Sequence, residues 1–185
     1  MFPSKYKLCF VDFETTGLGP DDKPIEIGAI LCDHNLAVIS KFHCLIKWPS
    51  FFQMEEWPER MQGAFKIHKI PVAAVLNGGM YPSEAREGLR GFIKDYRSPG
   101  DKIYMVSDNV VFETRMMLTL FGICGDPFNA ESDPFHYRAY DTSLMFQLMD
   151  VVKVYNTNTK NHRAMDDAEQ LLANFRDAVG RFNAG

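Results

Sequence analysis

The chain has 185 residues, of which 46% are hydrophobic, enough to bury one core, so we expect a single domain over residues 1–185. Its net charge of −4 argues against a protein that coats duplex nucleic acid non-specifically, because such proteins are basic. No apolar run is long enough to span a membrane and residues 1–7 lack a signal-peptide core, which predicts a cytoplasmic protein.

Three strands are predicted in the first part of the chain. An apolar run within residues 6–14 is typical of a buried strand, and a turn rich in Gly, Pro and Asp follows it. Residues 24–32 and 36–46 are the second and third strands, with His34 and Asn35 at the turn between them. We expect the three to form an antiparallel meander.

Helices and strands alternate in the rest of the chain. Pro58 suggests that the first helix starts near Trp57, and Pro71 stops it. The clearest helix begins near Ser83, a candidate cap, and Asn109 caps another. The predicted segments after residue 57 are helices at 57–67, 83–96, 109–121, 141–150 and 164–182, strands at 103–106 and 137–140, and a loop at 125–136. This order indicates an α/β fold.

Two carboxylates stand at the end of the first predicted strand. Asp12 and Glu14 are two residues apart, so they lie on one face while Val11 and Phe13 point the other way. Neighbouring carboxylates repel each other unless a cation lies between them, and oxygen ligands favour Mg²⁺ or Mn²⁺ over zinc. The alternative is a solvated edge strand with two acids that bind nothing. Four widely spaced cysteines without a C-x-x-C pair indicate neither a zinc site nor a disulfide framework.

Further acids recur at the predicted ends of strands and starts of helices. In α/β sheets such positions converge on one edge. Carboxylates there could hold two divalent cations about 4 Å apart, which clamp both oxygens of an in-line phosphoryl displacement. A histidine can then accept the proton of the attacking water. The recurring residues are Asp108, Glu113, Asp141, Asp166 and Asp167, with His162 close to the last two.

The spacing of His162 and Asp167 allows two arrangements. Residues five apart do not share a helix face. Both reach one site only if His162 lies on the preceding loop, and we expect the polar residues 156–161 to give that loop its freedom. Alternatively His162 caps the last helix, and Asp166 and Asp167 interact with its dipole.

Four segments in this order resemble the motifs of the DEDDh 3′→5′ exonucleases, a superfamily that includes ribonuclease T, oligoribonuclease and the proofreading subunit of DNA polymerase III. The resemblance covers about residues 6–175, and its first and last motifs are specific. The segments are residues 12–18 (DFETTGL), 67–70 (IHKI), 109–113 (NVVFE) and 162–168 (HRAMDDA).

The resemblance implies a ribonuclease H-like fold, with a mixed five-stranded sheet whose first three strands are antiparallel, flanked by helices. It implies that Asp12, Glu14 and Asp167 bind two metal ions, Mg²⁺ or Mn²⁺, and that His162 is the general base. Residues that would contact the substrate are Thr15, Thr16, Leu18, His68 and Asn109. For Leu18 the alternative is core packing, and for His68 a surface loop.

One position departs from the family. The second motif usually ends in Asp, and here it ends in Glu113, which keeps the charge but adds a methylene. We expect Glu113 to complete the metal site, with Asp108 as the nearby substitute. A third alternative is a weakened site in a protein that binds more than it cuts.

Several other residues leave alternatives open. Residues 135–143 are similar to oligoribonuclease, whereas the His68 region is closer to ribonuclease T, so DNA and RNA substrates both stay open. Asp141 is expected to cap its helix and support the site. Aromatic residues at 48–57 either stack on bases or fold onto the core, the favoured alternative. Four basic residues beside the motifs either bind phosphates or are simply solvated: Lys66, Lys69, Lys160 and Arg163.

The sequence thus predicts a metal-dependent exonuclease that shortens single-stranded nucleic acid from its 3′ end to 5′-mononucleotides and acts away from membranes. It leaves the oligomeric state open, with a homodimer as one option. The alternatives are a nucleic-acid-binding module weakened at Glu113 and an endonuclease of the same fold.

Overall fold

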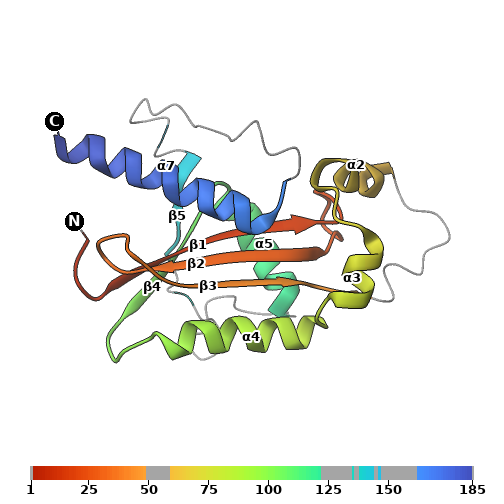
Figure 1. The fold of residues 1–185 in the computed structure, drawn as a ribbon, viewed down its shortest axis with the longest axis horizontal. Helices are drawn as coiled ribbons and strands as arrows, with labels where there is room; N and C mark the ends of the chain where they lie inside the picture. The colour runs from red at the N-terminus through yellow and green to blue at the C-terminus, as the bar shows by residue number, and fades with distance from the viewer. Residues whose placement is uncertain are drawn as a thin grey trace.

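The computed structural model describes residues 2–48, 59–121, 135, 138–143, 146 and 162–184. At its centre is one five-stranded sheet in the order β3-β2-β1-β4-β5 (Figure 1). β1 is antiparallel to β2, β2 is antiparallel to β3, and β4 runs parallel to both β1 and β5. The mixed sheet with three antiparallel strands first is therefore confirmed. The strands are β1 (Tyr6–Thr15), β2 (Pro24–Cys32), β3 (Val38–Leu45), β4 (Lys102–Ser107) and β5 (Tyr140–Asp141).

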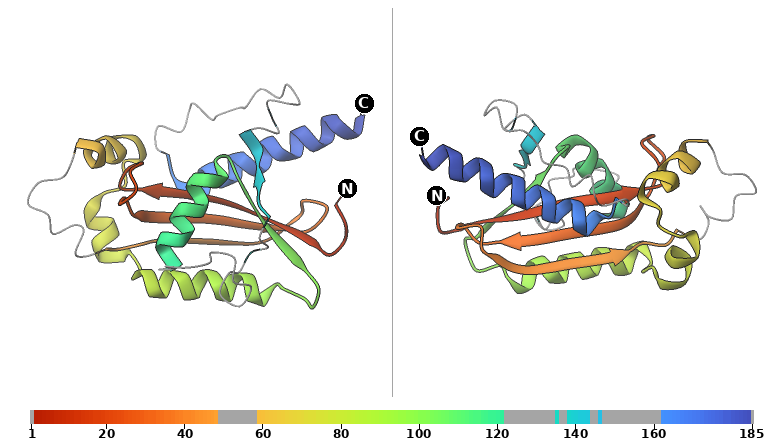
Figure 2. Two further views of the ribbon diagram at one scale, coloured as in Figure 1. Left: turned by 180° about the vertical axis from the view of Figure 1, so that it is seen from behind. Right: turned by 45° about the horizontal axis from the view of Figure 1, so that its top comes forward.

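Helices cover both faces of the sheet. α4 and α5 lie against one face, and α7 crosses the other, as the three views in Figures 1 and 2 show. The described helices are α2 (Glu59–His68), α3 (Val72–Gly78), α4 (Pro82–Asp95), α5 (Val110–Phe121) and α7 (Ala164–Ala184). None of these helices combines the length and the apolar character that crossing a bilayer requires.

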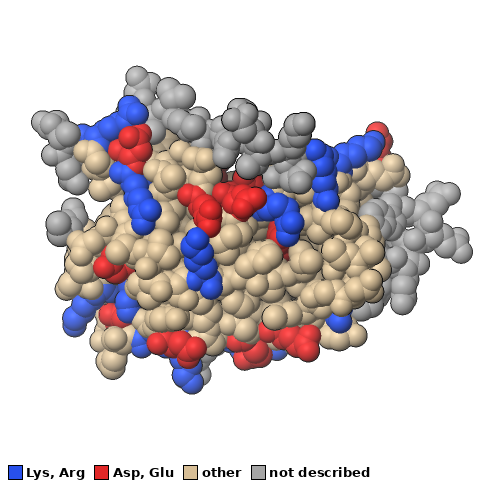
Figure 3. Space-filling model, viewed as in Figure 1, with Lys and Arg blue, Asp and Glu red and all other residues tan. Residues whose placement is uncertain are grey.

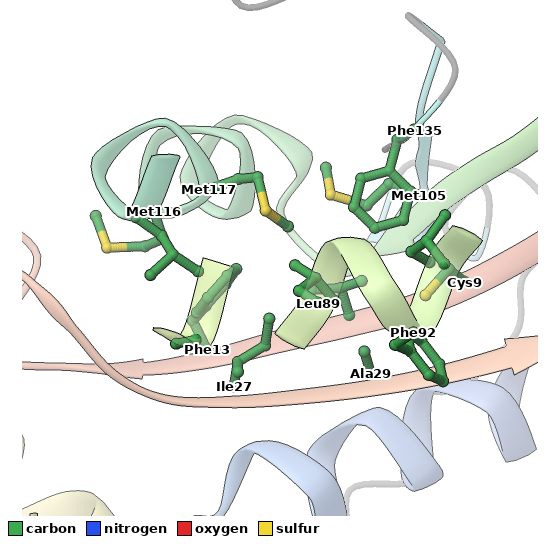
Figure 4. Close-up of a cluster of buried hydrophobic side chains, with 14 of the residues drawn as sticks. Cys9, Phe13, Ile27, Ala29, Leu89, Phe92, Met105, Met116, Met117 and Phe135 are labelled. Carbon is green, nitrogen blue, oxygen red and sulfur yellow. The ribbon is translucent and has the colours of Figure 1, made fainter. Parts of the chain in front are cut away.

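The core under α4 and α5 is built from alternate residues of the strands (Figure 4). Val11 and Phe13 of β1 are buried there, as the period of two predicts. Leu89 of α4 and Met116 of α5 pack onto the same cluster. Each fully buried side chain of this size stabilises the fold by about 1.5–3 kcal/mol relative to an exposed one.

The opposite face of β1 is apolar only along its first half. Leu8 and Phe10 pack there against Leu172 and Phe175 of α7. The Phe10 and Phe175 rings meet edge-on, with centroids 5.3 Å apart. The same alternation then brings Asp12 and Glu14 to this face, beside the first turn of α7. The apolar contacts of α7 therefore anchor the helix on the sheet, and its first turn lies beside the carboxylates.

Several element boundaries differ from the sequence predictions. Pro71 does end one helix region, but it also precedes α3, which was not predicted. α4 begins at Pro82, so Ser83 is not its cap; instead Glu84 accepts a hydrogen bond from the Tyr81 amide at 2.7 Å. β5 is shifted to residues 140–141.

Some predictions fall on residues that the structure does not describe. These are the aromatic residues Phe51, Phe52 and Trp57, most of the helix at 141–150, the polar run with Lys160, and Cys124. The other three cysteines are buried free thiols, as expected.

Candidate active site

Three carboxylates meet where β1 ends and α7 begins. Asp12 and Glu14 come from β1, and Asp167 comes from the first turn of α7. One oxygen of each lies within 4.8 Å of an oxygen of the other two. A set of oxygen donors at such distances fits a hard divalent cation. The structure thus favours a cation site over the alternative of two unrelated acids on an edge strand.

Crowding and burial disfavour the charged forms of these carboxyl groups and raise the pKa of each. Burial, then the charges of Glu113 and Glu14, raise the pKa of Asp12 well above its ordinary value. Burial and the charge of Asp167 raise the pKa of Glu14 to about 8. Burial is also the main reason that the pKa of Asp167 is raised. A bound cation would remove this penalty by compensating the charges.

Glu113 lies next to the three carboxylates without joining them. It is in the first turn of α5, only 5% exposed, and its carboxylate accepts a hydrogen bond from the Phe13 amide. Its Oε2 atom has no hydrogen-bond partner, and burial together with the charges of Glu14 and Asp108 raises its pKa. An unsatisfied buried carboxylate oxygen beside a cation site is a suitable further ligand.

Asp108, the predicted substitute, also borders the site. It lines a cavity of about 200 Å³ together with Asp12, His162 and Asp167. Its Oδ1 accepts hydrogen bonds from Thr142 at 3.3 Å and from Ser143 at 3.2 Å. Neither Asp108 nor Glu113 belongs to the group of three, so the choice between them stays a prediction.

His162 lies on the segment that precedes α7, as the first of its two predicted arrangements requires. Its Nδ1 is 3.4 Å from Oδ2 of Asp167, and its side chain is 58% exposed. The Asp167 amide donates to the carbonyl of Arg163, so Arg163 rather than His162 is the N-cap residue of α7, which begins at Ala164. His162 therefore faces both the carboxylates and the small cavity.

A larger cavity of about 470 Å³ opens on the other side of Glu14. Leu18 at its edge is 77% exposed, which excludes the core-packing alternative for this residue. Arg115 of α5 fixes the Leu18 turn by donating a hydrogen bond to the Leu18 carbonyl at 2.9 Å. The cavity is mostly apolar, and its lining includes Phe13, Glu14, Thr15, Leu18, Ala64, Ile67, His68 and Phe112.

His68 ends α2 and lines the same cavity. It is 2% exposed, so the surface-loop alternative is wrong. Burial lowers the pKa of His68 to about 4, and its Nδ1 accepts a hydrogen bond from the Ile70 amide at 3.1 Å. The neutral ring therefore carries its proton on Nε2. Lys69 has a φ of 55°, a left-handed conformation that favours glycine.

Three of the predicted residues form hydrogen bonds to other groups of the protein. Thr16 is fully buried behind the cavity, and its hydroxyl donates to Asp22 at 2.9 Å. Asn109 caps α5 by accepting a hydrogen bond from the Phe112 amide at 3.1 Å. The Asp141 carboxylate accepts a hydrogen bond from the Val110 amide at 3.2 Å and so binds the start of α5, while most of the helix that it was predicted to cap lies outside the described residues.

The predicted contacts to bases and phosphates are less well supported. Trp48 packs against the core and donates from Nε1 to the Pro24 carbonyl at 2.7 Å, as the favoured alternative expects. Arg163 is bound to Glu26 of β2, not left free for a phosphate. Lys66 and Lys69 are exposed. On the face drawn in Figure 3, lysine and arginine side chains are dispersed rather than gathered in one band.

Sequence reasoning missed Glu26, although the signal was present. A glutamate within the apolar stretch of β2 is fully buried, and buried glutamates are almost always paired. Gly28, two residues further on the same face, was also missed: a Cβ there would lie 2.4 Å from the carbonyl carbon and oxygen of Ala164. The start of α7 therefore rests directly on β2.

Comparisons with known proteins identify the family of the chain. A family model described as Exonuclease (RNase_T) matches residues 9–175. The oligoribonucleases of Alkalilimnicola ehrlichii and Dichelobacter nodosus are each 25% identical to the chain, over 97% and 95% of its length and 91% and 90% of theirs.

Solved structures of exonuclease I share the fold. E. coli exonuclease I in complex with a dT13 oligonucleotide has a TM-score of 0.69 and 16% identity, over 94% of this chain and 40% of that one. Exonuclease I from Methylocaldum szegediense has a TM-score of 0.69 and 18% identity, over 90% of this chain and 39% of that one. The chain thus spans about two fifths of those proteins. The family match over most of its length shows that the chain belongs to the RNase_T exonuclease family.

Proposed function

We propose that this exonuclease removes 5′-mononucleotides from the 3′ ends of single-stranded nucleic acid, with two Mg²⁺ or Mn²⁺ ions at its active site. The observation that carries the proposal is the meeting of Asp12, Glu14 and Asp167 within 4.8 Å, beside His162. Family membership supports the reaction class, and the dT13 complex of an exonuclease I with this fold supports a single-stranded substrate.

The two cavities on either side of the carboxylates suit the two sides of a phosphodiester. The larger, apolar one would hold the terminal nucleotide, with Leu18 and Ile67 at its exposed edge and His68 in its lining. The smaller one, lined by His162, has room for water. A scissile phosphate placed between them would lie over the three carboxylates.

The residues of the site have separate roles in the proposed reaction. Asp12, Glu14 and Asp167 would hold the divalent cations, with Glu113 or Asp108 completing the set. When bound, the cations supply positive charge that stabilises the transition state of an in-line displacement. His162 takes a proton from the attacking water as its oxygen bonds to phosphorus. The bond from phosphorus to the 3′ oxygen of the preceding nucleotide breaks, and that oxygen gains a proton from solvent.

A degradation panel tests the proposal. The purified protein is incubated with 5′-labelled single-stranded DNA and RNA, and with dinucleotides of each kind, in Mn²⁺, in Mg²⁺ or in EDTA. We expect a ladder that shortens from the 3′ end in the presence of metal only. Circular single-stranded DNA should stay intact, and its cleavage would indicate an endonuclease instead. Intact substrate under every condition would reject the proposal.

The position of Glu113 supports a second candidate, a nucleic-acid-binding module with weakened catalysis. Its carboxylate is held by the Phe13 amide and stays outside the group of three. Glu113→Asp distinguishes the two candidates. A protein that binds single strands but cuts only after this substitution would favour the module, whereas an active wild-type protein would reject it.

The length match to oligoribonucleases supports short RNA as a substrate, and the exonuclease I neighbours support single-stranded DNA. The panel decides between them. A homodimer, a cytoplasmic location and a single domain over the whole chain stay predictions.

A further inference from the structure

We infer that Glu26 and Arg163 are positioning residues, which together fix His162 and Asp167 relative to the carboxylates of β1. The inference rests on the proposed function, because it concerns the same site. Glu26 lies opposite Glu14 in the antiparallel pairing of β1 and β2, so it is one strand away from the carboxylates without being one of the group of three.

The Glu26 carboxylate is fully buried and saturated with donors. Arg163 Nε donates to Oε1 at 2.9 Å and to Oε2 at 3.1 Å, and Arg163 Nη2 also binds Oε1. The Ala164 amide donates to Oε2 at 3.0 Å, and Nε2 of His43 lies 2.7 Å from Oε1. Burial opposes ionisation, but these hydrogen bonds keep the pKa of Glu26 below its ordinary value. A forked guanidinium on a carboxylate has a defined geometry as well as strength.

This contact holds the chain on both sides of one peptide bond. Arg163 follows His162 directly, and its carbonyl accepts the hydrogen bond from the Asp167 amide at 2.9 Å. Ala164 is the first residue of α7. Glu26 therefore determines where the helix starts and in which direction its first turn presents Asp167. A negative charge at this helix end is also favourable for the helix dipole.

Gly28 provides independent evidence that β2 sets this position. Its missing side chain lets the Ala164 backbone approach so closely that a Cβ would lie 2.5 Å from the Met165 nitrogen. The close approach at Gly28 sets how near α7 lies to the sheet, while Glu26 sets its start. Both residues are on the α7 face of the strand, since they are two apart.

An alternative role for Arg163 is a contact to the substrate phosphate. Its side chain is 38% exposed, so part of it does face solvent. The two roles predict different kinetics. A positioning residue changes kcat, because the reacting groups are misplaced, whereas a phosphate contact changes KM and makes it less sensitive to salt. Only the positioning role predicts that substituting Glu26 also lowers kcat.

The experiment compares Arg163→Ala, Glu26→Gln and the double variant with wild type on a short 5′-labelled single strand. We expect each single variant to lose roughly 10- to 100-fold in kcat, with KM nearly unchanged. The double variant should lose no more than one single variant does, because the two side chains act as a unit. Millimolar guanidinium should restore part of the Arg163→Ala activity, and methylammonium should restore less.

A second readout does not depend on activity. Hydrogen exchange at residues 162–168 of the metal-free protein should speed up in both single variants and slow again when guanidinium is added to Arg163→Ala. Arg181→Ala is the matched control, since Arg181 pairs with Asp177 at the exposed far end of the same helix. It should leave kcat and the exchange of residues 162–168 unchanged. Arg163→Lys keeps the charge but loses the forked guanidinium, so its kcat and its exchange rates at residues 162–168 should be intermediate. It replaces Arg163→Ala in both experiments if that variant does not fold.

Three outcomes would overturn the inference. The first is full kcat in both single variants. The second is a raised KM for Arg163→Ala with Glu26→Gln unaffected, which would assign Arg163 to a phosphate. The third is an equal loss in Arg181→Ala. A wild-type protein that cuts nothing in the degradation panel would instead reject the proposed function, while the exchange experiment would still test the contact.

Discussion

The face of the sheet under α4 and α5 is closed by apolar side chains from Cys9 to Phe13 of β1, whereas the face under α7 is closed in two different ways. Near the start of β1, Phe10 and Phe175 form an apolar contact like those of the other face. Near its end, the contact is made of carboxylates, an ion pair whose Glu26 member is buried, and a glycine. One helix therefore carries both a stabilising half and a polar half, and substitutions in the two halves should have different consequences.

Removing a carboxylate of the polar half should have the largest effect on activity. Asp167→Asn keeps the shape of the side chain but removes a charge that would compensate a cation, so kcat should fall by roughly a thousandfold. Without metal, the same variant should melt at a higher temperature than wild type, because one repulsive charge is gone. Asp166→Asn, an exposed neighbour, is the control for activity and should keep kcat close to that of wild type. Wild-type kcat in Asp167→Asn would contradict the assignment of the site.

Truncation in the apolar half should reduce stability instead. Phe175 is 2% exposed, and Phe175→Ala should lower the free energy of unfolding by about 3–5 kcal/mol, measured by urea denaturation. Phe182→Ala, on the same helix but 76% exposed, should stay within about 0.5 kcal/mol of wild type. Equal losses in the two variants would mean that α7 is not anchored where the structure places it.

Gly28→Ala should displace the start of α7, where the polar half of the helix meets β2. The added Cβ meets the Ala164 backbone at 2.4 Å, so the start of α7 must shift and kcat should fall by roughly 10- to 100-fold. At Gly91 of α4 a Cβ meets nothing within 4 Å, and Gly91→Ala should stabilise the protein by about 0.5–1 kcal/mol. Measurements of kcat and of melting temperature on both variants test these two expectations. Normal turnover in Gly28→Ala would show that the close approach is not needed.

The smallest expected effect is a dependence of stability on pH. The raised pKa of Glu14, about 8 against an ordinary 4.5, means that the folded metal-free protein keeps a proton that the unfolded chain has released. Stability in EDTA should therefore fall as pH rises toward 8. Below pH 6.5 His68 acts in the opposite direction, since its pKa is about 4 when folded, so the interval from 6.5 to 8 isolates the carboxylates.

Manganese should reverse this trend. Cation binding displaces the protons, so the increase in melting temperature caused by Mn²⁺ should grow with pH over the same interval. Thermal melts in EDTA and in Mn²⁺ measure both slopes. A melting temperature in EDTA that rises from pH 6.5 to 8 would contradict the raised pKa of Glu14.

The sequence predicted most elements because their signals are local. Apolar runs and turn residues located the first three strands, and the meander that they form is confirmed. Pro71 was harder to interpret, because proline both ends a helix and tolerates the position before the next one, so α3 was missed. Ser83 looked like a cap, but Pro82 fits the first helical turn and displaced the start of α4.

The sequence by itself determined the family and the three carboxylates, because the residues that react are constrained in type and order along the chain. Only the tertiary structure decided how they are held. The pairing of Arg163 with Glu26 and the close approach at Gly28 join segments more than a hundred residues apart, which no local pattern encodes. The burial of Thr16 and His68 and the exposure of Leu18 likewise depend on which elements pack beside them, and burial is a property of that packing rather than of residue type.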